Sequence, residues 1–269
     1  MKNKLLIPLT LWILWSSCQN ISDQTQNTLK YTLIQTNSVN QNMPKITYEI
    51  SLSSEQQQLI EQIVKWYFSQ YPCGMKTITI SFDNPEDKKN ETTLAHVKSH
   101  CIYLDPEILT DNILLKNTIT HELFHTIKPD SLTIVDPYTL KDGYSIIGYH
   151  GLSIVVSNGK EQTQFWVIED AAAEACASLY YPEYSVPNIY YANAWSLMLK
   201  IIHKWWVDTN DLIQCQSNNG FEFFCEILLN KKPTPQDIES LMGIFNEVYM
   251  TQDDLTEEAL KKIEKIKNQ

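Results

Sequence analysis

The chain has 269 residues, of which 43% are hydrophobic and 20% are charged, so it is long enough to bury a substantial core. Its formal net charge is −11, and all 21 basic residues are lysine. This acidic balance argues against nucleic acid as a partner. The lack of arginine means that lysine, histidine, tyrosine or backbone groups must hold any substrate carboxylate.

Two lysines near the N-terminus precede an apolar run, Leu5–Trp15, which has the length of a signal peptide and is too short to span a membrane. Two serines follow it, and then Cys18. This order resembles a bacterial lipoprotein signal, although that family prefers leucine at the place of Trp15. The resemblance implies a signal peptide over residues 1–17 and an envelope protein anchored by a lipid on Cys18. Cleavage by an ordinary signal peptidase is the alternative, and both interpretations predict export.

Residues 18–43 are rich in glutamine, asparagine, serine and threonine and have little apolar surface to bury, so we expect a polar tether. We expect residues 44–269 to form one α+β domain. Its upper lobe, about residues 44–130, is predicted to contain a small twisted sheet and a central helix. Its lower lobe, about residues 160–269, is predicted to be mainly helical.

Hydrophobic periodicity and capping residues predict the elements of this domain in chain order. Strands are expected at Ile46–Leu52, Lys76–Phe82 and Leu94–Leu104, with a helix from Ser53 or Ser54 through Tyr71 between the first two. The next helix is expected to be capped by Thr110 or Asp111 and stopped by Pro129. Further helices are expected at Thr163–Tyr181, Asn188–Val207, Pro235–Tyr249 and Leu255–Ile266.

The helix stopped by Pro129 contains the most informative motif, His-Glu-Leu-Phe-His, at residues 121–125. Positions i and i+4 lie on one face of a helix, so His121 and His125 can bind the same metal ion. Glu122 is then placed to act on a water bound to that metal. This pattern is typical of zinc peptidases, in which two histidines bind Zn²⁺ and the glutamate is the general base.

A catalytic zinc site has three protein ligands and one position for water, so a third ligand is needed. The metzincin pattern places a glycine and a further histidine after the motif, and the segment Thr126–Pro129 has neither. Trp166-x-x-Glu169, with Ala172 three residues later, resembles the W-x-x-E-x-x-A pattern of gluzincins. The resemblance implies that Glu169, on the helix Thr163–Tyr181, is the third ligand.

Two other acids compete for this role. In many gluzincins an acid four residues after the ligand orients a ligating histidine, and here only Asp170 and Glu174 have that spacing. That register would make Asp170 the ligand, whereas the Glu169 register makes Asp170 or Glu174 a partner of a ligating histidine. Asp136 lies 11 residues beyond His125, a spacing that resembles the aspzincins. The sequence leaves Glu169, Asp170 and Asp136 open, and we expect Glu169.

The order of elements over residues 44–180 resembles the upper lobe of zincin peptidases. The resemblance implies that Leu94–Leu104 is an edge strand that binds extended peptide by strand addition. His150 and His203 are candidate catalytic residues, because either imidazole can donate a hydrogen bond to the oxyanion of the transition state.

The cysteines offer further constraints because an exported chain can form disulfides. Cys215 and Cys225 could close a local loop, and Cys73 could pair with Cys101, although sequence does not fix connectivity. Cys176 lies in an alanine-rich run, where we expect a small buried side chain.

Together these features predict an exported, membrane-tethered zinc peptidase that acts on a peptide or protein substrate. The alternative is a catalytically silent zincin-fold lipoprotein that serves as a peptide-binding or scaffold module. A different zinc hydrolase, such as an amidase acting on cell-wall peptides, is a third interpretation. The sequence gives no indication of oligomeric state.

Overall fold

The computed structural model describes residues 43–70, 77–82, 95–98, 100–180, 189–205, 207–251 and 253–269. Contacts divide the chain into Met1–Val39 and Asn40–Gln269, and the described residues all belong to the second unit. The predicted signal peptide, Cys18 and nearly all of the predicted tether lie outside the described residues. Within the described ranges, no helix combines the length and apolar character needed to cross a membrane.

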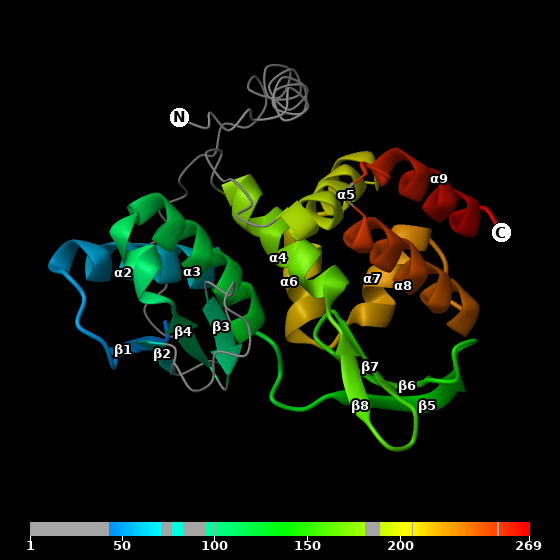
Figure 1. Ribbon diagram of the computed structural model, residues 1–269, viewed down its shortest axis with the longest axis horizontal. Coiled ribbons are helices and arrows are strands. Elements are labelled where there is room, and N and C mark those ends of the chain that lie inside the picture. Colours follow the sequence, from blue (N-terminus) through cyan, green and yellow to red (C-terminus); the bar gives the residue numbers. More distant parts are fainter. Residues whose placement is uncertain are drawn as a thin grey trace, which may run out of the picture. The chain divides into compact units, whose positions relative to one another are not determined.

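The first sheet has four strands in the order β1-β2-β4-β3 (Figure 1). Its strands are β1 (Lys45–Tyr48), β2 (Thr77–Phe82), β3 (Ala95–Lys98) and β4 (Cys101–Leu104). β1, β2 and β4 run parallel, whereas β3 is antiparallel to β4 and ends the sheet. Helix α2 (Ser54–Gln70) connects β1 with β2 and packs on helix α3, which also contacts β3 and β4.

The predicted strand Leu94–Leu104 is wrong, because this segment folds back on itself as the hairpin β3–β4. β3 ends at Lys98 and β4 begins at Cys101, and the sequence between them has no Gly, Asn or Pro to signal a break. His100 has a φ of 62°, in the left-handed region. Its Nδ1 lies 3.1 Å from the carbonyl oxygen of Thr126, so the hairpin turn is tied to the end of α3.

Helix α3 (Asn112–Thr126) carries the His-Glu-x-x-His motif. Its first turn is capped by Asp111, whose side chain accepts hydrogen bonds from the amides of Ile113 and Leu114, as one of the two predicted caps. The helix ends three residues before Pro129, which lacks the N–H needed to continue it. α3 packs against α2, α4, β3 and β4 and is buried on most of its surface. The helix that carries the motif is therefore held by its neighbours on several sides.

The segment of the chain between α3 and the next helix forms a second sheet (Figure 1). It is a fully antiparallel meander of β5 (Thr133–Thr139), β6 (Ser145–His150), β7 (Ser153–Ser157) and β8 (Gln162–Phe165). β8 also takes up the start of the predicted helix Thr163–Tyr181, so that helix begins later, at Val167.

The remainder of the described chain is helical, and the predicted α+β class is confirmed. The helices are α4 (Val167–Tyr180), α5 (Ile189–Trp205), α6 (Thr209–Ser217), α7 (Phe221–Leu229), α8 (Pro235–Met250) and α9 (Thr256–Lys267), with a short 3-10 turn, η1 (Pro106–Thr110), before α3. α4 contacts α3, α5, α6, α8 and β7. Its almost fully buried alanines let these neighbours approach closely; they are Ala171, Ala172, Ala173, Ala175 and Ala177.

The described cysteines carry free thiols, so the predicted pairing of Cys215 with Cys225 is not formed. Burial raises the pKa of the Cys215 thiol to about 12, and it also raises the pKa of the Cys225 thiol well above its ordinary value. Cys176 is half-buried rather than fully buried, and burial also raises its pKa to about 12. Cys101 is also a free, buried thiol, so the predicted Cys73–Cys101 pair is not formed, although Cys73 itself is not among the described residues.

The cap of α3 yields a first prediction. Asp111→Ala removes the acceptor for two amides in the first turn of the motif helix, so we expect it to lower the free energy of unfolding by about 1 kcal/mol. Asp111→Asn keeps an acceptor oxygen and should lower the free energy of unfolding much less. Urea denaturation followed by circular dichroism measures both variants. Equal stability of the alanine variant and the wild type would contradict the role given to this cap.

Candidate metal centre

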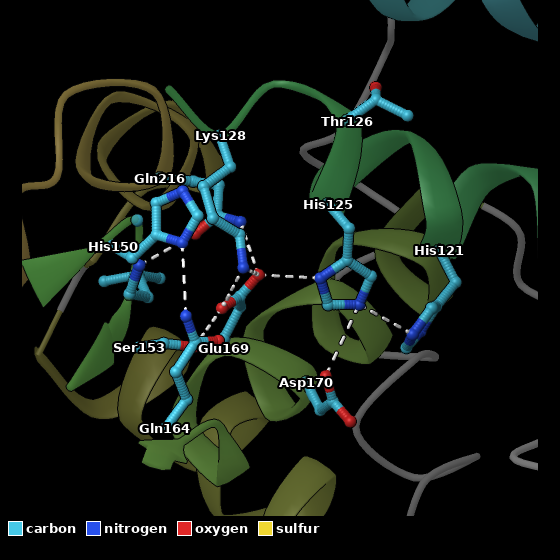
Figure 2. Close-up of polar contacts among 12 residues, drawn as sticks. His121, His125, Thr126, Lys128, His150, Ser153, Gln164, Glu169, Asp170 and Gln216 are labelled. Atoms are coloured by element: carbon cyan, nitrogen blue, oxygen red, sulfur yellow. Dashed lines mark hydrogen bonds and ion pairs between the residues drawn. The ribbon is translucent and has the colours of Figure 1, made fainter. Parts of the chain in front are cut away.

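The two motif histidines and one acid from α4 bring their ligand atoms together (Figure 2). The Nε2 atoms of His121 and His125 are 3.1 Å apart, and Nε2 of His125 is 3.4 Å from Oδ1 of Asp170. The ligand atoms of all three side chains lie within 4.8 Å of one another. The stacking of i and i+4 on α3 and the packing of α4 against α3 produce this convergence.

These separations fit a zinc ion. Tetrahedral zinc with bonds of about 2.0–2.1 Å holds its ligand atoms about 3.3–3.4 Å apart, close to the His121–His125 and His125–Asp170 distances, and the third separation lies within 4.8 Å. The side chains of His121, His125 and Asp170 are 16%, 15% and 18% exposed, so none of the three is completely enclosed.

Glu169, the ligand expected from sequence, occupies a different place. Its Oε1 is 2.7 Å from Nδ1 of His125, the ring nitrogen that faces away from the cluster. Lys128, Ser153 and Gln216 also donate hydrogen bonds to its carboxylate. With its side chain 2% exposed and both oxygens engaged, Glu169 orients a histidine instead of joining the candidate ligand set.

Glu174 lies beside the other histidine, at a longer distance. Its Oε1 is 3.4 Å from Nδ1 of His121, so each imidazole has a buried glutamate of α4 at the nitrogen opposite the cluster. This is the alternative register considered from sequence, in which Asp170 is the ligand and Glu174 the partner of a histidine. Within the described part of the chain, Nδ1 of His121 and Oε2 of Glu174 have no hydrogen-bond partner.

Glu122 lies beside the ligand cluster and is almost fully buried, with 6% of its surface exposed. Its charge acts on both His121 and Asp170, and it raises the pKa of each. The carboxylate predicted to be the general base therefore lies within electrostatic range of two of the three candidate ligands.

The pKa shifts in the cluster reflect an excess of negative charge. Burial alone would lower the pKa of His121, but the charges of Glu174, Glu122 and Asp170 outweigh it and raise the pKa to about 10. Burial raises the pKa of Asp170 to about 6, an effect that the two imidazoles oppose and the charges of neighbouring carboxylates reinforce.

Glu169 shows the opposite shift. Burial disfavours its charged form, but the hydrogen bond and charge of His125 and the charge of Lys128 together hold its pKa well below the ordinary value. The same carboxylate and that of Asp170 raise the pKa of His125 against the effect of burial. Lys128 is thus the cation bound to Glu169, whereas the cluster around Asp170 can gain charge balance from a divalent ion.

The other residues predicted from sequence lie away from the cluster. His203 is exposed on α5, and Asp136 is exposed on β5. His150 has Nε2 2.7 Å from the carbonyl oxygen of Pro129 and Nδ1 3.3 Å from the side chain of Gln164. Figure 2 shows its ring beyond Lys128 and Glu169 as seen from the two motif histidines. The structure therefore does not bring His150, His203 or Asp136 into the candidate ligand set.

Sequence reasoning missed the three donors around Glu169, namely Lys128, Ser153 and Gln216. A signal for Lys128 was available, because a buried acid needs compensation and this lysine follows His125 by three residues. No local pattern marks Gln216, which is 47 residues from Glu169 in sequence and fully buried.

Comparison with known proteins adds no assignment to this geometry. The chain has no significant match among family models, curated proteins or solved structures. The functional interpretation therefore depends on the residues of the site themselves.

Glu169 and Asp170 should behave differently when each is neutralised. We expect Asp170→Asn to lose most of its zinc, because a ligand oxygen with charge is removed. Glu169→Gln should keep the metal with about 10–100-fold weaker affinity, because only the partner of His125 changes. Chelator-competition titrations of the two variants measure this difference. If Glu169→Gln loses zinc and Asp170→Asn keeps it with wild-type affinity, the sequence-predicted ligand is correct and this geometry is not.

Metal binding should also release protons. At pH 7 the metal-free His121 holds a proton because its pKa is about 10, and zinc must displace that proton to reach Nε2. As the pH falls through about 6, Asp170 takes up a proton as well, so more protons are displaced and the apparent affinity falls. Calorimetric titrations with zinc in buffers of different ionisation enthalpy count these protons. A binding enthalpy independent of the buffer at pH 7 would contradict the ligand set.

Proposed function

We propose that the protein is a zinc-dependent peptidase with a gluzincin-like site. The observation that carries this proposal is the convergence of the ligand atoms of His121, His125 and Asp170, with Glu122 almost fully buried beside them. A zinc ion held by these three side chains would have room for a water molecule as a further ligand, and the side chains are only partly buried.

The residues of the site have separate roles in the proposed reaction. A zinc ion bound there supplies a Lewis acid that polarises the scissile carbonyl and acidifies a water molecule. The carboxylate of Glu122 accepts a proton from the attacking water and returns it to the nitrogen of the leaving amine. Glu169 accepts a hydrogen bond from Nδ1 of His125, and the carboxylate of Glu174 lies 3.4 Å from Nδ1 of His121, so both acids favour a proton on Nδ1 and a free Nε2 lone pair.

The first sheet supports a peptide substrate. β3 ends the strand order and contacts α3, the helix that carries the motif. Its outer edge can accept an extended peptide by backbone hydrogen bonds, which would place the peptide alongside the metal ligands. This replaces the longer edge strand expected from sequence with a four-residue strand, and it fits a zincin-like division into a sheet-bearing upper lobe and a mainly helical lower lobe.

We place this activity in the cell envelope. The proposal rests on the sequence of the first 43 residues, where an apolar run, Cys18 and a polar segment follow one another as in a tethered lipoprotein. Labelling with a radioactive fatty acid in a bacterial host, with Cys18→Ala as the comparison, tests the lipid anchor.

Replacing the general base gives the sharpest test of mechanism. Glu122→Gln should retain zinc, because Glu122 is not a ligand, and should lower kcat by about 10²–10⁴-fold. Glu107→Gln, an exposed change on η1, is the matched control and should cleave at the wild-type rate. Metal analysis and the rate of peptide cleavage are measured on the same preparations. Wild-type turnover by Glu122→Gln would rule out the mechanism.

Finding a substrate for this test requires a peptide-library digest of the purified protein, with and without chelator. Cleavage that stops on chelation and returns with added zinc supports the peptidase. A zinc-loaded protein that binds peptides and cleaves none is instead the silent peptide-binding module.

A further inference from the structure

We propose that Gln216 on α6 is a positioning residue of the metal centre, which fixes the orientation of His125 by holding Glu169. The inference rests on the proposed function to the extent that it requires the metal site, but not on peptide cleavage. It concerns a side chain 47 residues from Glu169 in sequence and on a different helix. The evidence is the pair of hydrogen bonds made by the oxygen and the nitrogen of the Gln216 side-chain amide.

Gln216 is fully buried, yet its amide makes both kinds of hydrogen bond. Nε2 donates to Oε1 of Glu169 over 2.8 Å, and Oε1 accepts from the backbone amide of Leu152 over 2.8 Å. Exchanging the two ends would set an oxygen against a carboxylate and an NH₂ group against an N–H. The chemistry of its two neighbours therefore fixes the orientation of this amide.

The β6–β7 turn is shaped around the same amide. Gly151 has a φ of +63°, and a Cβ built at this position would lie 2.4 Å from Oε1 of Gln216. The backbone amide of Gly151 donates to Oδ1 of Asn219 over 2.6 Å, and Nδ2 of Asn219 donates to the carbonyl of Ser131 over 2.8 Å. α6 and the turn that follows it are thus joined by side-chain hydrogen bonds both to the hairpin and to the segment after α3.

Glu169 connects Gln216 with His125, which is a candidate metal ligand. Its Oε1 receives both the Gln216 amide and Nδ1 of His125, the latter at 2.7 Å (Figure 2). With Nδ1–H donating to this oxygen, the lone pair of Nε2 is left facing His121 and Asp170. Removing the Gln216 donor frees Glu169 to turn within its pocket of donors, and the His125 ring can then turn with it.

The test compares Gln216→Met with Gln214→Met. Methionine keeps the length of the side chain but has neither the donor nor the acceptor, and Gln214 is an exposed glutamine on the same helix. We expect Gln216→Met to weaken zinc binding about 10–100-fold in a chelator-competition titration, as changes in partners of ligating histidines do. It should also change the visible absorption spectrum of the cobalt-substituted protein. Gln214→Met should leave affinity and spectrum unchanged.

A purely structural role predicts a different pattern. It would lower the melting temperature of the metal-free protein and leave the zinc dissociation constant and the cobalt spectrum of the folded protein as in the wild type, which would overturn the proposal. If Gln216→Met does not fold, Gln216→Asn retains a polar amide but is one methylene too short to bridge Glu169 and Leu152. It should then show the weaker zinc binding, and wild-type affinity in this variant would also overturn the proposal.

Whether Gln216 acts through Glu169 can be tested by combining Gln216→Met with Glu169→Gln. If Gln216 acts through Glu169, the two losses of zinc affinity will not add, whereas independent effects will. The outcomes also separate this inference from the peptidase assignment. A wild-type protein that binds zinc but cleaves no peptide contradicts only the peptidase, and the zinc measurements still decide the role of Gln216. A wild-type protein that binds no zinc contradicts both.

Discussion

The burial of several carboxylates around two imidazoles is the constraint on which this site depends. Glu122, Glu169 and Glu174 are each less than a tenth exposed, and Asp170 lies among them. Lys128 is bound to Glu169 alone of these acids in the described contacts. Buried charge of one sign is unfavourable unless it is paired or bound to a metal. A divalent cation at the imidazole nitrogens would balance the negative charge of these carboxylates.

Two adjacent acids of helix α4 have different roles at this site. Glu169 and Asp170 are neighbours in sequence, but successive side chains on a helix point about 100° apart. Glu169 faces Lys128 and Gln216 and is saturated by hydrogen bonds, whereas Asp170 faces the Nε2 side of His125. The environment of each acid therefore sets its role, and their pKa values shift in opposite directions.

Much of this arrangement could be predicted from local sequence, because it depends on spacing along one helix. The stacking of His121 and His125, the cap of α3 by Asp111 and the presence of acids on an alanine-rich second helix all have local signals. Which acid meets the histidines does not, because that depends on how α4 packs across α3. The W-x-x-E-x-x-A resemblance pointed to Glu169, which contacts the outer nitrogen of His125 instead. Gln216 could not be predicted because its partners come together only in the tertiary fold.

An anomalous-difference map collected above and below the zinc absorption edge, from crystals of the zinc-loaded protein, tests the central claim most directly. The geometry predicts one peak about 2.0–2.2 Å from Nε2 of His121, Nε2 of His125 and a carboxylate oxygen of Asp170, with Glu169 still bound to the outer nitrogen of His125. No peak between the two imidazoles, or a peak bound by Glu169 with Asp170 turned away, would contradict it.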